Sequence, residues 1–259
     1  TSNKVPYASK IIALIFFIIK LILMSNIRLF YPESLSLNLT ATLDKSQSHY
    51  VSKVMRAKEN EVFSLFNNSG EWEAKILSIS KINVEFNITK QLRQKENFKE
   101  LWLAFSPIKS NYFNFMIQKA TELGVTKFIP IISERTIVRN INQERLQKIV
   151  TEASEQSNRL NIPKVEKIIS FENFIKNNQN LNIIFGDLNT SNNNLNIKIL
   201  KNKIICILIG PEGDFSENER QLIVDNKKTV SISLAKNILR TETAAIAATT
   251  ILSHNLNFK

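Results

Sequence analysis

The sequence is poor in the residue types that build several kinds of site. Its one cysteine, Cys206, lies in an apolar run and has no partner for a disulfide within the chain, so we expect a core residue in a reducing compartment. The two histidines, His49 and His254, lie far apart, and a Cys/His zinc site is not expected. A Ser-His-Asp triad has no G-x-S-x-G motif to support it.

Glycine is also rare, with five in 259 residues, and two of the five fall in one short segment. Gly210 and Gly213 belong to "GPEGD", directly after the apolar run "KIICILI", which predicts a strand at the centre of a parallel sheet. Ligands of such sheets bind beyond the carboxyl ends of the strands. We therefore expect these glycines to allow positive φ and a close approach of a ligand, the alternative being an ordinary tight turn. Ser216 and Glu219 predict a capping box that opens the next helix.

The charge is strongly biased, because 34 lysines and arginines face 23 acidic residues and give a net charge of +11. Such a surface suits a polyanion such as nucleic acid, although it could also be merely well solvated. With 43% hydrophobic residues, the chain can bury a real core.

The first 23 residues differ from the rest. Residues 11–23 are apolar but span only about half the length that a bilayer needs, and Lys20 interrupts them. No small-residue cleavage site follows, and Met24 begins a segment typical of a natural start. We expect residues 1–23 to be an extension outside the fold, with a membrane anchor as the alternative.

Residues 24–90 predict a small β-barrel domain. Short alternating segments recur between turns, as at Trp72, Ala74 and Ile76, and "NNSG" is typical of a hairpin. A helical turn within residues 48–61 carries three cations that are either a solvated face or an RNA-contacting edge: Lys53, Arg56 and Lys58. The polar residues 91–100 predict a linker.

Residues 101–259 alternate between strands and helices, which predicts a mostly parallel sheet covered on both faces. Pro130 predicts an edge strand or a bulge. A second strand-end loop follows residues 229–234 and brings Arg240, Thr241 and Glu242 to the start of an alanine-rich helix. Neither loop is a Walker A or a G-x-G-x-x-G motif, which favours a small neutral or cationic cofactor over a nucleotide phosphate.

Five segments carry a resemblance to a known family. "IGPEGDFSENE" and "LAKNILRTETAAIAA" strongly resemble the SPOUT superfamily of RNA methyltransferases, and more narrowly the bacterial family that methylates N3 of a uridine in 16S ribosomal RNA (uridine 1498 type). Residues 118–136, residues 152–165 and the N-terminal "IRLFYPE … SHYVSKVMR" agree with it. The family commonly has glycine where Asp214 and Ala235 stand; we expect Asp214 to lie beyond the tightest bend, whereas Ala235 leaves its backbone conformation open.

The resemblance implies a trefoil-knotted parallel sheet preceded by a PUA-like β-barrel, S-adenosylmethionine as cofactor, 16S ribosomal RNA or the small ribosomal subunit as partner, and a cytoplasmic homodimer without membrane attachment. Residues 111–123 and 243–252 are its expected interface helices, with core packing as the alternative. It implies the following cofactor-binding residues: Ile209, Gly210, Pro211, Glu212, Gly213, Leu234, Ile238, Leu239, Arg240, Thr241 and Thr243. Its expected RNA-binding residues are Arg28, Lys53, Arg56, Lys58, Arg135 and Arg159.

Methylation of uridine N3 requires loss of the N3 proton, and therefore a base or cations that stabilise the uridinate. The expected catalytic residues are Arg240, Glu242, Glu122 and Arg159, with Glu212 as a further candidate, and each of them could instead be a structural salt bridge or cap. Two rival functions remain open, namely a methyltransferase with another RNA target and a non-catalytic ribosome-assembly factor.

Overall fold

The computed structural model describes residues 27–97, 99–194 and 204–257. The chain divides into two compact units, residues 1–96 and 97–259. The predicted extension, residues 1–23, lies outside the described residues. Within the described ranges, no helix has both the length and the apolar character needed to cross a bilayer.

The first unit is a five-stranded sheet of order β1-β3-β4-β5-β2. Its elements are β1 (Arg28–Phe30), β2 (Thr40–Thr42), α2 (Lys45–His49), the π-helix η1 (Tyr50–Val54), β3 (Val62–Asn67), β4 (Gly70–Ile79) and β5 (Val84–Gln94). The predicted alternation is confirmed, since Ala74 and Ile76 are fully buried while Trp72 packs against the edge of the same core. The "NNSG" turn joins β3 to β4 and pairs Asn67 with Gly70.

The linker prediction was partly wrong, because β5 continues to Gln94 and the next strand begins at Glu100. The last residues of β5 are mostly polar and charged, so their composition indicated a linker and not a strand. Arg93 there forms ion pairs with Glu71 at 3.2 Å and with Glu96 at 2.7 Å, which explains why charged residues are accommodated.

The second unit is a parallel sheet of order β12-β10-β11-β6-β7-β8, with β9 pairing to β7. Its elements are β6 (Glu100–Phe105), α3 (Ser110–Glu122), β7 (Lys127–Ile132), α4 (Gln143–Gln156), β8 (Lys164–Val165), β9 (Ile169–Ser170), α5 (Phe171–Asn177), β10 (Asn182–Gly186), β11 (Ile204–Ile209), α6 (Glu217–Asp225), β12 (Thr229–Ile232) and α7 (Thr241–Asn257). As predicted, β11 lies inside the sheet, between β10 and β6.

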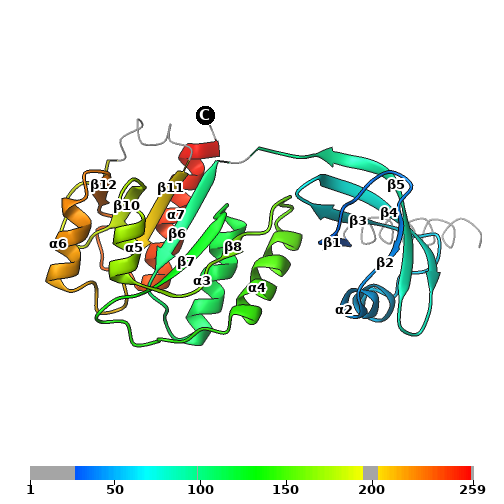
Figure 1. The fold of residues 1–259 in the computed structure, drawn as a ribbon, viewed down its shortest axis with the longest axis horizontal. Coiled ribbons are helices and arrows are strands. Elements are labelled where there is room, and N and C mark those ends of the chain that lie inside the picture. The colour runs from blue at the N-terminus through cyan, green and yellow to red at the C-terminus, as the bar shows by residue number, and fades with distance from the viewer. Residues whose placement is uncertain (1–26, 98, 195–203, 258–259) are drawn as a thin grey trace, which may run out of the picture. The chain divides into compact units, whose positions relative to one another are not determined.

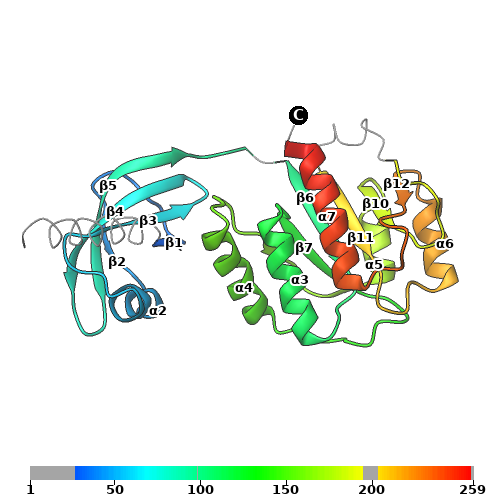
Figure 2. The same ribbon diagram turned by 180° about the vertical axis from the view of Figure 1, so that it is seen from behind.

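Helices cover both faces of this sheet. Figure 2 shows α3, α4 and α7 on one face, and Figure 1 shows α5 and α6 on the other. The α3 helix ends before Gly124, whose φ of 108° makes it the expected glycine after the last turn. The edge-strand prediction from Pro130 was wrong. The β7 strand pairs with β6 on one side and with two short strands on the other, and Pro130 falls between the residues that pair with β8 and those that pair with β9. Its missing N–H therefore costs no ladder hydrogen bond there.

Candidate functional site

The carboxyl ends of the parallel strands bring the two predicted loops together. Gly186, the last residue of β10, lies between side chains from both neighbouring strand ends. A Cβ on Gly186 would come within 2.9 Å of Ile209 Cδ1 and 3.0 Å of Leu234 Cδ1. Two predicted cofactor-binding residues, one at the end of β11 and one on the loop after β12, thus meet over a glycine that the sequence analysis did not single out. Its rarity and its place at the end of "LNIIFGD" were the available signal.

The "GPEGD" turn has a different backbone from the predicted one. Neither Gly210 nor Gly213 has a positive φ, so that expectation was wrong. The left-handed residue is Asp214, with φ 58°, and its N–H donates to the carbonyl of Pro211 at 3.0 Å. Asp214 therefore stands at the tight bend itself and not beyond it. Its Oδ1 accepts a hydrogen bond from the N–H of Phe215 at 2.8 Å, which helps an aspartate to occupy a position that favours glycine.

Close packing explains Gly210 instead. A Cβ there would lie 3.1 Å from two atoms of the Phe215 ring and 3.2 Å from Asp214 Oδ1. At Gly213 the nearest atoms would be carbons of Arg135, at 3.7 and 3.8 Å, which is ordinary van der Waals contact. Gly213 and its neighbour Glu212 are exposed, whereas Gly210 and Pro211 are buried. The turn thus presents its outer half to solvent.

Two charged residues hold this turn against the end of β7. Arg135 Nη1 donates to the carbonyls of Gly213 at 2.9 Å and Phe215 at 3.4 Å. The predicted capping box between Ser216 and Glu219 is confirmed, and Glu219 is almost fully buried. Its carboxylate also accepts the N–H of Glu134 at 2.8 Å. Arg135, expected to bind RNA, is therefore engaged with the backbone of the predicted cofactor loop.

A part-buried ion pair stabilises the neighbouring strand end. Asp187, directly after β10, accepts two hydrogen bonds from Arg220 of α6, at 3.2 Å from Nε and 2.9 Å from Nη2. Burial opposes ionisation of Asp187, but the hydrogen bonds from Arg220 and from the N–H of Asn189 outweigh it and lower the pKa of the carboxyl. No local pattern in the sequence indicates this pair, because its partners are 33 residues apart.

Hydroxyl groups occupy the ends of β6 and β7. Ser106 Oγ lies 3.2 Å from Ser133 Oγ, which lies 2.7 Å from Thr136 Oγ1, and all three residues are buried. The Ser106 N–H also donates to the carbonyl of Ile209 at 3.3 Å. This cluster ties β6, β7 and β11 together directly beneath the loops.

The second predicted loop leads into α7. Arg240 is exposed, and its Cζ lies 5.8 Å from the centroid of the Tyr112 ring on α3. Its carbonyl accepts the hydrogen bond from the N–H of Ala244, so α7 begins directly after it. Within the described chain no ion pair joins Arg240 to Glu242, although Glu242 was expected to orient it. The side chain of Ile238, an expected cofactor-binding residue, is 84% exposed and packs into no part of the core.

The remaining residues of this loop differ in exposure. Thr241 is buried, Leu239 is half-buried and Thr243 is exposed. Ala235 is not among the residues with positive φ, so the alanine stands in a backbone conformation that suits any L-residue.

Two expected catalytic residues lie at the opposite end of the sheet. Glu122 ends α3 and pairs with Lys119 at 2.9 Å. Arg159 donates to the carbonyl of Thr121, at that same end of α3, and to Oδ1 of Asn161 at 3.1 and 3.2 Å. Burial lowers the pKa of Arg159 to about 10, which still leaves it protonated at neutral pH. Within one chain these residues do not join Arg240.

The expected RNA-binding residues of the first unit fall into two kinds. Arg28 is almost buried, with its Nε 3.1 Å from Glu71 Oε1 and its Cζ 3.7 Å from the Phe66 ring centroid. This packing makes Arg28 part of the domain core. By contrast, the three cations near η1 are all exposed: Lys53, Arg56 and Lys58.

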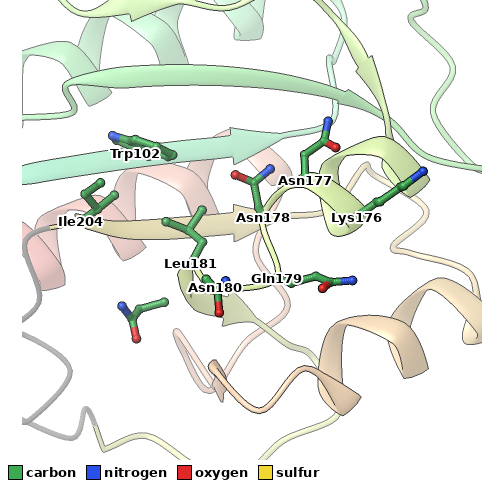
Figure 3. A pocket seen from close by; sticks show the side chains of 9 residues that line it. Trp102, Lys176, Asn177, Asn178, Gln179, Asn180, Leu181 and Ile204 are labelled. Carbon is green, nitrogen blue, oxygen red and sulfur yellow. The ribbon is translucent and has the colours of Figure 1, made fainter.

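A separate cavity of about 470 Å³ lies at the amino ends of β10 and β11. Figure 3 shows Trp102 and Ile204 on the strand side of it and Lys176, Asn177 and Asn178 at the end of α5. None of the loop residues described above lines it. Because ligands of parallel sheets bind at the carboxyl ends of the strands, we place the functional site at the loops and not in this cavity.

The described residues offer neither a metal site nor a reactive cysteine. No three histidines, cysteines, aspartates or glutamates in those ranges are grouped to hold a metal ion. Burial raises the pKa of the Cys206 thiol to about 12, so it is no nucleophile at neutral pH.

Comparisons with known proteins agree with this geometry. Residues 94–253 match the model of an RNA methyltransferase domain, and residues 43–89 match that of an RNA methyltransferase PUA domain. Ribosomal RNA small subunit methyltransferase E of Rickettsia conorii is 42% identical over 204 residues, which cover 77% of this chain and 83% of that protein. The enzyme of the same name from Buchnera aphidicola (from Schizaphis graminum) is 34% identical over 243 residues, or 87% and 94% of the two chains.

Solved structures give the same result. A ribosomal RNA small subunit methyltransferase E from Neisseria gonorrhoeae, bound to S-adenosyl methionine, superposes with a TM-score of 0.79 at 31% identity and covers 88% of this chain and 96% of its own. The predicted PUA-like unit followed by a SPOUT-type parallel sheet is confirmed, while the knot stays a prediction. The chain belongs to the ribosomal RNA small subunit methyltransferase E family of RNA methyltransferases.

Proposed function

We propose that this chain methylates N3 of a specific uridine in 16S ribosomal RNA and uses S-adenosylmethionine as methyl donor. The observation that carries the proposal is that Ile209, directly before the "GPEGD" turn, and Leu234 meet over Gly186, at the carboxyl edge of a sheet that matches an RNA methyltransferase domain. The Neisseria gonorrhoeae structure of the same family holds S-adenosyl methionine. The relatives from Rickettsia and Buchnera are named for ribosomal RNA of the small subunit.

The residues at this edge fit the cofactor. Ile209 and Leu234 offer apolar side chains beside Gly186, which suits an adenine ring, and the exposed half of the turn offers backbone groups near Gly213. The other residues that we propose to hold it lie on the "GPEGD" turn, on the loop after β12 or in the first turn of α7: Gly210, Pro211, Glu212, Ile238, Leu239, Arg240, Thr241 and Thr243. When bound, the cofactor supplies an electrophilic methyl group.

Arg240 has the position for the main catalytic role on the side of the RNA. It is exposed at the start of α7, next to Leu239 and the buried Thr241, and its Cζ lies 5.8 Å from the centroid of the Tyr112 ring. A permanent positive charge there would stabilise the negative charge that uracil carries once N3 has lost its proton. Glu242 in the first turn of α7 and Glu212 in the turn are the carboxylates at this edge that could accept that proton.

RNA would also contact the first unit through its exposed cations. The side chains of Lys53, Arg56 and Lys58 form no ion pair within the described chain, although the backbone N–H of Lys58 donates to Glu61 Oε2 at 2.6 Å, so their charges can contact phosphates. Replacing all three with alanine should weaken RNA binding and lower the slope of log affinity against log salt by roughly one unit per lost contact. An unchanged slope would leave them as a solvated surface. Arg28, held by Glu71, is expected to contribute through folding.

We further propose a homodimer acting in the cytoplasm, where small-subunit RNA is found. The α3 helix exposes two aromatic side chains, Tyr112 at 51% and Phe115 at 49%. Ile246 and Ile251 of α7 are only half-buried, and α7 packs on α3. An apolar surface of this kind suits a second copy of the chain. Light scattering should give twice the chain mass, and Phe115→Asp should shift it toward the monomer.

Methyl transfer tests the whole proposal. Purified protein should methylate N3 of one uridine in small-subunit RNA, mapped by mass spectrometry. Arg240→Ala should lower the single-turnover rate by about two orders of magnitude, with Arg240→Lys recovering part of it. Arg139→Ala, an exposed arginine of the loop after β7, is the control. Cofactor binding without any transfer would favour a non-catalytic assembly factor, and a modified nucleotide elsewhere would favour another RNA target.

A further inference from the structure

The turn that carries Gly213 is fixed to the sheet from one side. Its residues 213–216 contact two consecutive residues that follow β7, Glu134 and Arg135. Arg135 Nη1 bridges two carbonyls of the turn, those of Gly213 at 2.9 Å and Phe215 at 3.4 Å. The stem of the same side chain lies along Gly213, because its Cβ and Cδ would be 3.8 and 3.7 Å from an added Cβ.

Glu219 holds the other end of the turn. One carboxylate oxygen accepts the N–H of Glu134 at 2.8 Å, and the other accepts the N–H of Ser216 at 3.0 Å. Glu219 is 7% exposed, so both bonds are shielded from water and a neutral replacement cannot make both with one carbonyl oxygen. The hydrogen bond to Ser216 is sufficient to complete the capping box of α6. The additional bond to Glu134 therefore has another role, which is to join the turn to the end of β7.

These contacts surround a strained residue. Asp214 adopts φ 58° between the two carbonyls that Arg135 binds. A left-handed aspartate persists when its surroundings restrain it, and here both the bridge from Arg135 and the turn bond to Pro211 do so. Without Arg135, the exposed segment from Glu212 to Asp214 would keep only its local bonds and would sample other shapes.

We infer that Arg135 and Glu219 are positioning residues, which keep the 210–216 turn in the shape that receives S-adenosylmethionine. This inference rests on the proposed function. Arg135 then acts on cofactor affinity through the backbone that it holds, because ordering the turn in advance removes an entropic cost of binding. An RNA-binding role alone would leave cofactor affinity untouched.

The test compares Arg135→Ala with Arg139→Ala, which removes the same charge from the same loop four residues on. Calorimetry with S-adenosylmethionine should show an affinity about tenfold weaker for Arg135→Ala, because the released turn must then be ordered on binding, and an unchanged affinity for Arg139→Ala. Arg135→Lys should recover part of the loss. The KM for S-adenosylmethionine should rise more than kcat falls, because Arg135 acts on the turn that receives the cofactor and not on the reacting atoms. Glu219→Gln should weaken cofactor binding too, together with some loss of thermal stability.

Hydrogen exchange of the cofactor-free protein distinguishes the inference about Arg135 from the proposed methyltransferase function. Arg135→Ala should raise the exchange rates of amides 213–216 and leave those of β11 unchanged. Equal cofactor affinity for Arg135→Ala and the parent would overturn the inference while leaving the proposed function intact. A parent protein that does not bind S-adenosylmethionine would overturn the proposed function, and exchange would still decide whether Arg135 holds the turn.

Discussion

Gly213→Ala should have opposite effects on stability and on cofactor binding. The added methyl group would meet only Arg135 carbons, at 3.7 and 3.8 Å, so no protein atom has to move. Gly213 also has no positive φ, so its backbone suits an alanine. Replacing glycine by alanine at such a position stabilises a protein by about 0.4–1 kcal/mol, since the unfolded chain loses freedom. The variant should therefore be as stable as the parent or slightly more stable.

Cofactor binding should fall in the same variant. Gly213 is exposed on the half of the turn that faces away from the core, and a ligand that approaches its backbone closely would meet the new methyl group. We expect the affinity for S-adenosylmethionine to drop at least tenfold, about 1.4 kcal/mol. Gly213→Val should abolish binding, because its second branch enlarges the clash.

Gly210→Ala is the matched control. Its Cβ would stand 3.1 Å from the Phe215 ring and 3.2 Å from Asp214 Oδ1, so it should overpack the turn and lower the free energy of unfolding by about 1–3 kcal/mol. Urea unfolding and calorimetry measure both quantities. Normal cofactor affinity in a folded Gly213→Ala protein would refute the placement of this turn in the pocket, and a marked loss of stability would refute the backbone argument.

Three further residues give additional tests. Asp187→Asn should lower the free energy of unfolding by about 2 kcal/mol at pH 7, as measured by urea unfolding. Because folding lowers the pKa of Asp187, this difference in stability should be present above about pH 4 and should shrink as the pH falls through the folded-state pKa. Asp214→Ala should cost about 1–2 kcal/mol at its φ of 58°, while Asp214→Gly should cost less, measured the same way; equal losses would contradict the strain argument. Cys206, fully buried with its thiol pKa raised to about 12, should not react with a thiol reagent until the protein unfolds.

The fold was largely predictable because its signals are local. Apolar runs marked the buried strands, and Gly124 and Ser216 marked one helix end and one helix start. The failures came where a partner distant in sequence decides the outcome. Pro130 is tolerated inside the sheet because two short strands happen to leave a gap opposite it. The extension of β5 to Gln94 depends on ion pairs across strands.

The site was predictable as a place but less so in its details. The strand-end position of "GPEGD" follows from the rules of parallel sheets. The role of each residue within it depends on contacts between segments that are distant in sequence. Asp214 adopts the left-handed conformation of the bend, Gly186 leaves room for the side chains of Ile209 and Leu234, and Arg135 binds the carbonyls of the turn. Arg28 shows the converse error, since a cation in an RNA-binding domain was assumed to be exposed and is instead paired with Glu71.

The separation between Arg240 and Glu122 yields the last prediction. Arg240 lies against Tyr112 near the start of α3, and Glu122 ends that helix, so about ten residues, or roughly 15 Å along the axis, separate them within one chain. One uracil cannot contact both, unless two copies pair through α3 in antiparallel fashion and bring the end of one helix beside the start of the other. Glu122→Gln is the suitable change, because Glu122 is exposed and pairs only with Lys119 among the ion pairs of the described chain. If Glu122 serves the partner's site, both Glu122→Gln and Arg240→Ala homodimers should be impaired, whereas mixed dimers of the two variants should regain about half of the parent transfer rate, since one of their two sites keeps both groups. Full activity of the Glu122→Gln homodimer would assign Glu122 to the ion pair with Lys119 alone. Mixed dimers that are no more active than the two variant homodimers would refute a site shared between chains.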